Sequence, residues 1–336
     1  MARMRIDGRR ECPMKTKAER LLPEKKSLSQ RILRSVYQYK WFYLFALPGI
    51  LYFLLFKYFP IILGVIVSLK NYSPFSGRGL KAIFEAPSAG LYHYKRLFMQ
   101  KDFYSVLGNT LRISLKKLVF TFPAPIIFAL LLNEVGCVKF KRTVQTVSYL
   151  PHFISIVVIA GLVRMLLDSQ NGPLYAVLQA IGLKSNVPYL ANTKYFDGIL
   201  VGMNLWMGFG WNSIVYLSAL TSIDSGLYEA AEIDGASKLQ QVWYVTLPSI
   251  MPTIVVMLIL QVGHILDAGY QDILLLYSEL TYSVADVFDT YVYRLGVEEA
   301  SYGLTAALGL FKSVIGTILV VGTNKLANKT GENGLW

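Results

Sequence analysis

The chain has 336 residues, of which 54% are hydrophobic and only 16% are charged, and its formal net charge is +12. Length alone would suggest two soluble domains, but this composition, with several apolar stretches near bilayer length, indicates a single polytopic membrane domain. The basic excess does not indicate nucleic-acid binding, because 12 of the 33 basic residues fall in the first forty positions, ahead of an apolar run. That distribution is expected of a cytoplasmic tail facing anionic lipid.

The amino-terminal region predicts a tail without a cleavable signal peptide. Residues 1–26 are polar and basic, lack an apolar core, and are expected to be partly disordered. Leu28, Ile32 and Val36 then share one helical face, which is typical of a helix resting in the membrane interface. A soluble amphipathic helix fits less well, because an apolar run follows within five residues. We therefore expect residues 1–40 to form a basic cytoplasmic tail that ends in an interfacial helix.

Six apolar stretches are long enough to cross a bilayer as helices. They cover residues 41–69, 111–132, 144–167, 199–220, 247–270 and 304–321. We therefore predict an all-α membrane domain over residues 41–325 and a cytoplasmic tail over 326–336. Lys57 is an intramembrane charge to which the sequence assigns no role. Lys116 and Lys117 lie near one end of the second stretch, where long side chains can snorkel to the headgroups.

The distribution of basic residues predicts the orientation. With the amino terminus inside, the cytoplasmic segments hold 18 Lys and Arg residues and the outer segments hold 9. This asymmetry predicts an inner-membrane, multi-pass protein with both termini in the cytoplasm. Cys12 and Cys137 then fall in cytoplasmic segments and imply no disulfide.

A mostly polar segment, residues 228–248, lies between two of the most apolar stretches. Asp224 or Ser225 can cap a helix that continues to Asp234, and Gly235 allows the left-handed turn that ends or bends it. A second short helix over 237–245 would lead into the fifth predicted span. The six-span count places this segment, within a loop over 221–248, in the cytoplasm.

The chemistry of this segment is contact rather than catalysis. Ala230 and Ala231 give a small, smooth face that a partner's groove can approach closely, and Glu229 and Glu232 flank it with negative charge. These features predict a docking helix that transmits force from a moving partner protein. The alternative is an ordinary amphipathic loop helix.

The same residues resemble the signature of the permease subunits of bacterial ATP-binding-cassette (ABC) importers. That signature is EAA, three residues, Gly, nine residues, an aliphatic residue, one residue and Leu-Pro. The matching residues are Glu229, Ala230, Ala231, Gly235, Val245, Leu247 and Pro248. The neighbours Asp234, Ala236 and Ser237, with the flanking segments GFGWNS at 208–213 and DVFDTYVYR at 286–294, resemble the branch that takes up oligosaccharides of the maltose, alginate or polygalacturonate type.

The resemblance implies function and partners. It implies a permease that moves an oligosaccharide by alternating access, together with a second homologous permease, two cytoplasmic ATPase subunits and an extracytoplasmic solute-binding protein. ATP and magnesium would bind in the partner subunits, and this chain would bind no cofactor or metal of its own. The residues expected to couple to the ATPase are Glu229, Ala230, Ala231, Asp234, Gly235, Ala236, Leu247 and Pro248.

No catalytic motif appears in the sequence. The three histidines are scattered, and no phosphate-binding loop, HExxH or GxSxG motif is present. A membrane enzyme would need a cluster of His, Asp or Ser at one membrane face, which the sequence does not show. A secondary transporter remains as an alternative, although it would need no docking loop and would more often show an internal repeat or paired intramembrane charges.

Polar residues inside the last three predicted spans are candidates for a sugar pathway, because a polar group in hydrocarbon must find a partner or face water. They are Asn204, Trp206, Trp211, Asn212, Gln261, His264, Asp267 and Lys312. Aromatic rings can stack on sugar faces, and amides and imidazoles can bind hydroxyls. The competing interpretation is that the amides join helices and the tryptophans mark the interface.

The spacing of the last four candidates makes two further predictions. Gln261 and His264 should share a helix face with Ala268, whereas Asp267 should point elsewhere. Lys312, near the middle of the sixth span, should pair with a carboxylate, for which Asp267 is a candidate, or face a wet cavity. With a uronic-acid substrate it could instead attract the sugar.

Overall fold

The structure is a computed structural model that describes residues 37–77, 79–182, 187–329, 331 and 334–336. The contacts separate two compact units, Met1–Ile62 and Leu63–Trp336. Most of the predicted tail and interfacial helix, together with Cys12, lies outside the described residues. Cys137 is exposed and free.

The first unit holds most of one long helix. Helix α2 (Lys40–Phe53) passes through a π-helical turn, Leu54–Tyr58, into α3 (Phe59–Ser68), which continues into the second unit. The helical run Lys40–Ser68 has 29 residues and matches the first predicted span within one residue at each end. Lys57 lies in the π-helical turn with an exposed side chain, and its role stays unassigned.

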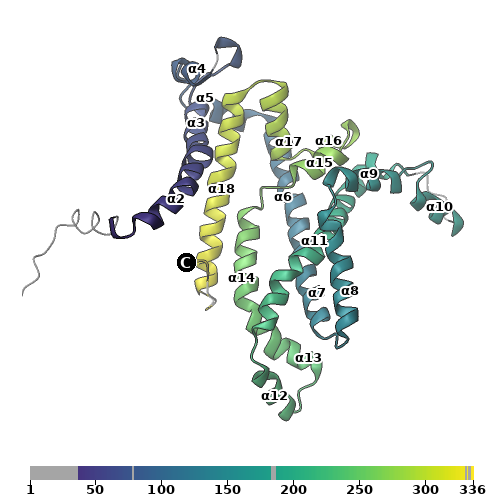
Figure 1. Cartoon of the computed structure of the whole chain (residues 1–336). Helices are drawn as coiled ribbons and strands as arrows, with labels where there is room; N and C mark the ends of the chain where they lie inside the picture. Colours follow the sequence, from purple (N-terminus) through teal and green to yellow (C-terminus); the bar gives the residue numbers. More distant parts are fainter. Residues whose placement is uncertain (1–36, 78, 183–186, 330, 332–333) are drawn as a thin grey trace, which may run out of the picture. The chain divides into compact units, whose positions relative to one another are not determined.

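The second unit is built from helices of very different lengths (Figure 1). Those of the first half are α4 (Gly79–Glu85), α5 (Tyr92–Met99), α6 (Lys101–Thr121), α7 (Pro123–Asn133), α8 (Val138–Tyr149), α9 (Ile156–Leu166) and α10 (Pro173–Ala180). Those of the second half are α11 (Thr193–Thr221), α12 (Ser225–Ile233), α13 (Lys238–Gln241), α14 (Leu247–Gly263), α15 (Tyr270–Leu276), α16 (Tyr282–Ala285), α17 (Phe288–Tyr293) and α18 (Tyr302–Lys329). Among the described residues, β pairing is limited to one isolated bridge between Lys70 and Ser88.

The all-α membrane architecture is confirmed for the described part of the chain. Four helical runs there are long and apolar enough to cross a bilayer, and a bent pair of helices makes a fifth candidate. The four runs are Lys40–Ser68, Lys101–Asn133, Lys238–Gly263 and Tyr302–Lys329. Helix α11, which contains the fourth predicted span, has 29 residues and is long enough, but it is less apolar than these four.

The second span begins earlier in the structure than the predicted start at residue 111. The helical run begins at Lys101, ten positions before residue 111, because the polar residues that suggested a loop are bonded inside the protein. Asn109 donates to the carbonyl oxygens of Ser283 and Asp286 at 3.1 Å each, and the Thr110 hydroxyl accepts from the amide of Phe288 at 3.0 Å. Contacts about 175 residues away in sequence are invisible to a local hydropathy pattern.

The third predicted span, 144–167, is not one straight helix. Its two halves, Val138–Phe153 and Ile156–Leu166, meet at an angle of 97°. Pro151 lacks a backbone N–H, and Ile154 and Ser155 have extended ψ angles near 136°, so the α-helical hydrogen-bond ladder stops between them. The first of these helices begins at Val138, six residues before the predicted start of the span.

Helix α11 is the element around which the membrane helices of the second unit pack. It contacts α6, α7, α8 and α14, and three buried apolar clusters include residues of α11 or of helices that touch it. Buried Asp197 joins α11 to α6 by ion pairs to Arg112 at 2.9 Å and to Lys116 at 2.8 Å. Lys116 is therefore not simply a snorkelling side chain.

Candidate functional site

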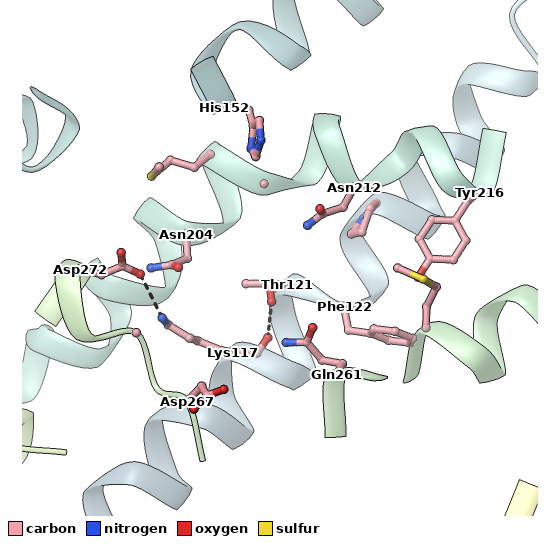
Figure 2. A pocket seen from close by; sticks show the side chains of 15 residues that line it. Lys117, Thr121, Phe122, His152, Asn204, Asn212, Tyr216, Gln261, Asp267 and Asp272 are labelled. Atoms are coloured by element: carbon pink, nitrogen blue, oxygen red, sulfur yellow. Dashed lines mark hydrogen bonds and ion pairs between the residues drawn. The ribbon is translucent and has the colours of Figure 1, made fainter. Parts of the chain in front are cut away.

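A polar cavity of about 440 Å³ lies among α6, α7, α11, α14 and α15. Figure 2 shows side chains from these helices turned toward a common space. The space lies inside the group of membrane helices, yet much of its lining is polar. The lining residues are Lys117, Thr121, Phe122, Pro125, His152, Asn204, Met207, Gly208, Asn212, Tyr216, Met257, Gln261, Asp267, Gly269 and Asp272.

One stripe of α11 supplies two of the three side-chain amides of this cavity. Asn204, Gly208 and Asn212 are four residues apart, so they follow one another along a single helix face. Asn204 donates one hydrogen bond to the Leu200 carbonyl oxygen at 2.9 Å, which leaves its oxygen for other partners. Gln261 lines the cavity from α14. The structure therefore brings together all three amides that were predicted for the pathway.

The predicted aromatic lining is different from the observed one. Trp206 and Trp211 are 46% and 37% exposed, and neither lines the cavity. Trp211 instead stacks on His152, with ring centroids 4.5 Å apart and planes 3° from parallel, and His152 itself lines the cavity. The sequence missed His152 because the bend before α9, which brings it to α11, cannot be read from local composition.

The predicted geometry of the fifth span is wrong beyond residue 263. Helix α14 ends at Gly263, and the hydrogen bond from the amide of Asp267 to the His264 carbonyl, 2.8 Å, closes a tight turn. Gln261 and Asp267 therefore face one cavity, whereas His264 does not line it. The helical spacing used in the prediction does not apply once the helix has ended.

Lys312 on α18 is paired as the sequence suggested. It contacts a carboxylate oxygen of Asp267, the predicted partner, and one of Asp289 on α17. His264 lies 2.8 Å from the other oxygen of Asp267. Lys312, Asp267 and His264 border a second cavity, of about 530 Å³, between α14 and α18. With two carboxylates bound, Lys312 does not offer a free positive charge to an anionic substrate.

Lys117 and Asp272 are cavity residues that the sequence prediction missed. Lys117 is only 13% exposed, donates to the Ala268 carbonyl oxygen at 2.7 Å, and lies 3.3 Å from a carboxylate oxygen of Asp272. The predicted snorkelling of Lys117 to the headgroups is thus wrong. Only its partner on α15, 155 residues away, accounts for its position.

The predicted docking segment lies at one end of the second unit, far from α15 and α16 (Figure 1). Asp224 caps α12, as one of the two predicted candidates, by accepting from the amide of Gly226 at 2.9 Å. Gly235 has φ +78°, which confirms the left-handed turn. Glu229 and Ala230 are exposed and Ala231 is half-buried, so the small face is accessible.

The second part of the docking segment forms one helix with the following span. Helix α13 begins at a capping box between Ser237 and Gln240 and continues through a π-helical turn, Val242–Thr246, into α14. The predicted separate helix over 237–245 is therefore joined to the span. Lys238 donates to Glu232 at 3.1 Å across the turn at Gly235, and this hydrogen bond lowers the pKa of the exposed Glu232 carboxyl below its ordinary value.

Large apolar side chains are exposed in and around this segment. Ile233 is 87% exposed, Tyr244 is 78% exposed and Leu239 is 68% exposed. Together with the small face, they make a surface suited to contact with another protein. The remaining coupling candidates Asp234, Ala236, Leu247 and Pro248 fall in the turn at Gly235 or at the start of α14.

The sequence profile of the binding-protein-dependent transport system inner membrane component family matches residues 121–330. The match spans more than half of the chain, and it includes α12, α13 and most of the cavity lining. The chain belongs to this family. It is the membrane-spanning permease subunit of an ABC importer.

Two relatives from Bacillus subtilis (strain 168) resemble the permease over most of its length. It is 40% identical to the polygalacturonan/rhamnogalacturonan transport system permease protein YteP over 312 residues, 93% of this chain and 95% of that protein. It is 39% identical to Protein LplB over 297 residues, 88% of this chain and 91% of that protein.

Solved structures show the same fold. One chain of a bacterial ABC transporter involved in the import of the acidic polysaccharide alginate is 39% identical, with a TM-score of 0.81, and the match covers 89% of the permease and 99% of that chain. A second structure, of a bacterial alginate ABC transporter with an alginate pentasaccharide-bound periplasmic protein, is 37% identical, with a TM-score of 0.82 over 91% of the permease and 100% of that chain.

Proposed function

We propose that the permease passes an oligosaccharide of uronic acids through the cavity between α6, α11 and α14. The observation that carries the proposal is the polar lining of this cavity inside a set of membrane helices. Its volume of about 440 Å³ falls within the range of roughly 300–1,000 Å³ that is common for small-molecule sites. Amides of Asn204, Asn212 and Gln261 offer both donors and acceptors, which suit sugar hydroxyls.

The uronic-acid class rests on the similar proteins. YteP is described as a permease for polygalacturonan and rhamnogalacturonan, and the structural relatives belong to transporters of the acidic polysaccharide alginate. Identities of 37–40% over about nine-tenths of the chain support a substrate of the same chemical class.

The docking surface supports the proposed partners. Two cytoplasmic ATPase subunits would bind ATP and magnesium, and one of them would receive α12, with Glu229 making charge-assisted hydrogen bonds to donors in its groove. This chain would bind no cofactor or metal. A second homologous permease would complete the pathway, and an extracytoplasmic solute-binding protein would deliver the sugar from the side opposite to α12.

The orientation belongs to the same proposal. If α12 faces the ATPase in the cytoplasm, α15 and α16 at the opposite end of the unit face outward (Figure 1). The excess of basic residues in the predicted inner segments supports this orientation, with both termini in the cytoplasm.

The test is transport by the assembled complex in lipid vesicles. Uptake of labelled trigalacturonate should require ATP on the side of the membrane that holds the ATPase subunits and the solute-binding protein on the opposite side. Vanadate should stop this uptake. Uptake that continues without ATP, or that follows an imposed ion gradient, would identify a secondary transporter. Failure to transport any uronic-acid oligomer, with ATP-driven uptake of a neutral oligosaccharide, would reject the substrate class alone.

A further inference from the structure

The Lys117–Asp272 ion pair is placed at the wall of the cavity rather than at the protein surface. Lys117 comes from α6 and Asp272 from the first turn of α15, and both line the same space as Asn204. Figure 2 shows the contact between the two charged groups within this lining. Their side chains are 13% and 19% exposed, so the pair is a largely buried element of the cavity wall.

The chain between α14 and α15 is shaped around this pair. Gly269 has φ +99°, a conformation that residues with a β-carbon rarely adopt. A β-carbon at this position would lie 2.7 Å from the Lys117 nitrogen and 2.9 Å from a carboxylate oxygen of Asp272. The absence of a side chain at Gly269 therefore lets the Ala268 carbonyl oxygen and Asp272 reach the same ammonium group.

The pair has hydrogen-bonding capacity left over. An ammonium group has three N–H donors, and among the described residues those of Lys117 meet two acceptors, the Ala268 carbonyl oxygen and Oδ2 of Asp272. Within the same part of the chain, Oδ1 of Asp272 has no hydrogen-bond donor assigned to it. The wall thus offers one donor and one acceptor close together, which matches a hydroxyl group or two neighbouring hydroxyls of a sugar ring.

The charge balance of the wall disfavours a carboxylate at this position. The residues that line the cavity include one lysine, Lys117, and two carboxylates, Asp272 and Asp267. Asp267 is bound by Lys312 and Lys117 is bound by Asp272, so the described lining has no lysine or arginine without a carboxylate partner. Bringing another carboxylate into a partly buried site without a free cation is costly.

We propose that the Lys117–Asp272 pair binds ring hydroxyls of the sugar in the cavity and does not read its carboxylates. This inference rests on the proposed sugar pathway and adds the residues and the chemical group that they recognise. The neighbouring Lys116 provides a matched comparison, because it lies on the same helix but pairs with Asp197 outside the cavity lining and is 48% exposed.

Saturation-transfer difference NMR on the assembled complex, without the solute-binding protein, tests the inference at millimolar sugar concentrations. The probes are trigalacturonate and its carboxyl-reduced counterpart, the galactose trimer, which differ only in the carboxylates. Wild type should bind both. Lys117→Met should raise both apparent Kd values about tenfold, because a charged hydrogen bond is lost, whereas Lys116→Met should change neither. If Lys117→Met does not assemble with the ATPase, the neutral double variant Lys117→Met, Asp272→Asn replaces it, with the same expected loss.

Each other result overturns the inference. A loss confined to trigalacturonate, or wild-type binding of trigalacturonate alone, would show that the cavity reads carboxylates. Unchanged binding by the assembled variant would show that the pair only joins α6 to α15. Absence of binding of either sugar to wild type would reject the sugar pathway itself, which separates failure of the proposed function from failure of this inference.

Discussion

Replacing Lys312 by Met should destabilise the permease, because Lys312 is the cation that two carboxylates share. Asp267 comes from the turn after α14, and Asp289 comes from α17, so the lysine on α18 joins three parts of the fold. Lys312 is 19% exposed, Asp289 is 21% exposed and Asp267 is 48% exposed. Methionine keeps most of the side-chain volume but removes the charge.

The magnitude follows from the two carboxylates left behind. Both carboxylates contact the Lys312 nitrogen, so their oxygens are at most about 5 Å apart. Two negative charges at about 5 Å repel each other by about 3 kcal/mol at an effective dielectric constant near 20, and by about 0.8 kcal/mol in water. The partial exposure places the expected loss at about 1–3 kcal/mol. For a chain of this length, that corresponds to a fall of about 2–8 °C in the midpoint of thermal unfolding.

The assay is the thermal unfolding of the detergent-purified complex. The control is Lys325→Met, because Lys325 is exposed on the same helix and has no ion pair among the described residues. Adding Asp289→Asn to Lys312→Met should restore at least half of the loss, since the remaining carboxylate of Asp267 keeps His264 as its partner. An unchanged midpoint for Lys312→Met, or a double variant less stable than the single one, would refute the reasoning.

Three further predictions separate coupling from the pathway. Gly235→Gln should abolish uptake while the protein stays in the membrane, because φ +78° disfavours a β-carbon although the space around it is open; near-normal uptake would contradict the docking assignment. Glu229→Ala should weaken co-purification of the ATPase or uncouple its activity from the binding protein, and unchanged assembly and stimulation would mark a solvated charge. Gln261→Ala should lower sugar flux about tenfold or more while the complex still assembles, because Gln261 lines the cavity. Trp211→Ala should lower the flux less, because Trp211 acts on the cavity only through His152. A loss of folded protein in proportion to the loss of activity would indicate that these residues serve helix packing instead.

The local features of the docking segment were readable from the sequence. The cap at Asp224 and the left-handed turn at Gly235 depend on residues within a few positions of each other, and both are present. The long apolar runs were likewise sufficient to predict an all-α membrane protein, since a bilayer-spanning helix satisfies its backbone hydrogen bonds within its own segment.

The pathway shows where local pattern was insufficient. Asn204, Asn212 and Gln261 were predicted to belong to the pathway because polar groups in membrane helices need a partner or water, and all three line the cavity. Trp206 and Trp211 were selected as pathway candidates from the same predicted span as Asn204 and Asn212, yet they do not line the cavity. Their orientation is set by packing between helices, which a single sequence does not display.

The sequence by itself determined the fold class, the apolar runs and the docking turn, because these follow from hydropathy and from backbone preferences acting over a few residues. Only the tertiary structure decided that α14 ends at Gly263, that the third span bends by 97°, and that Lys117 meets Asp272. The end of α14 and the bend are local turns that the apolar pattern does not reveal, whereas the partner of Lys117 lies 155 residues away along the chain. A buried charge is stabilised by the group that reaches it in space, and that group becomes known only when the helices are packed together.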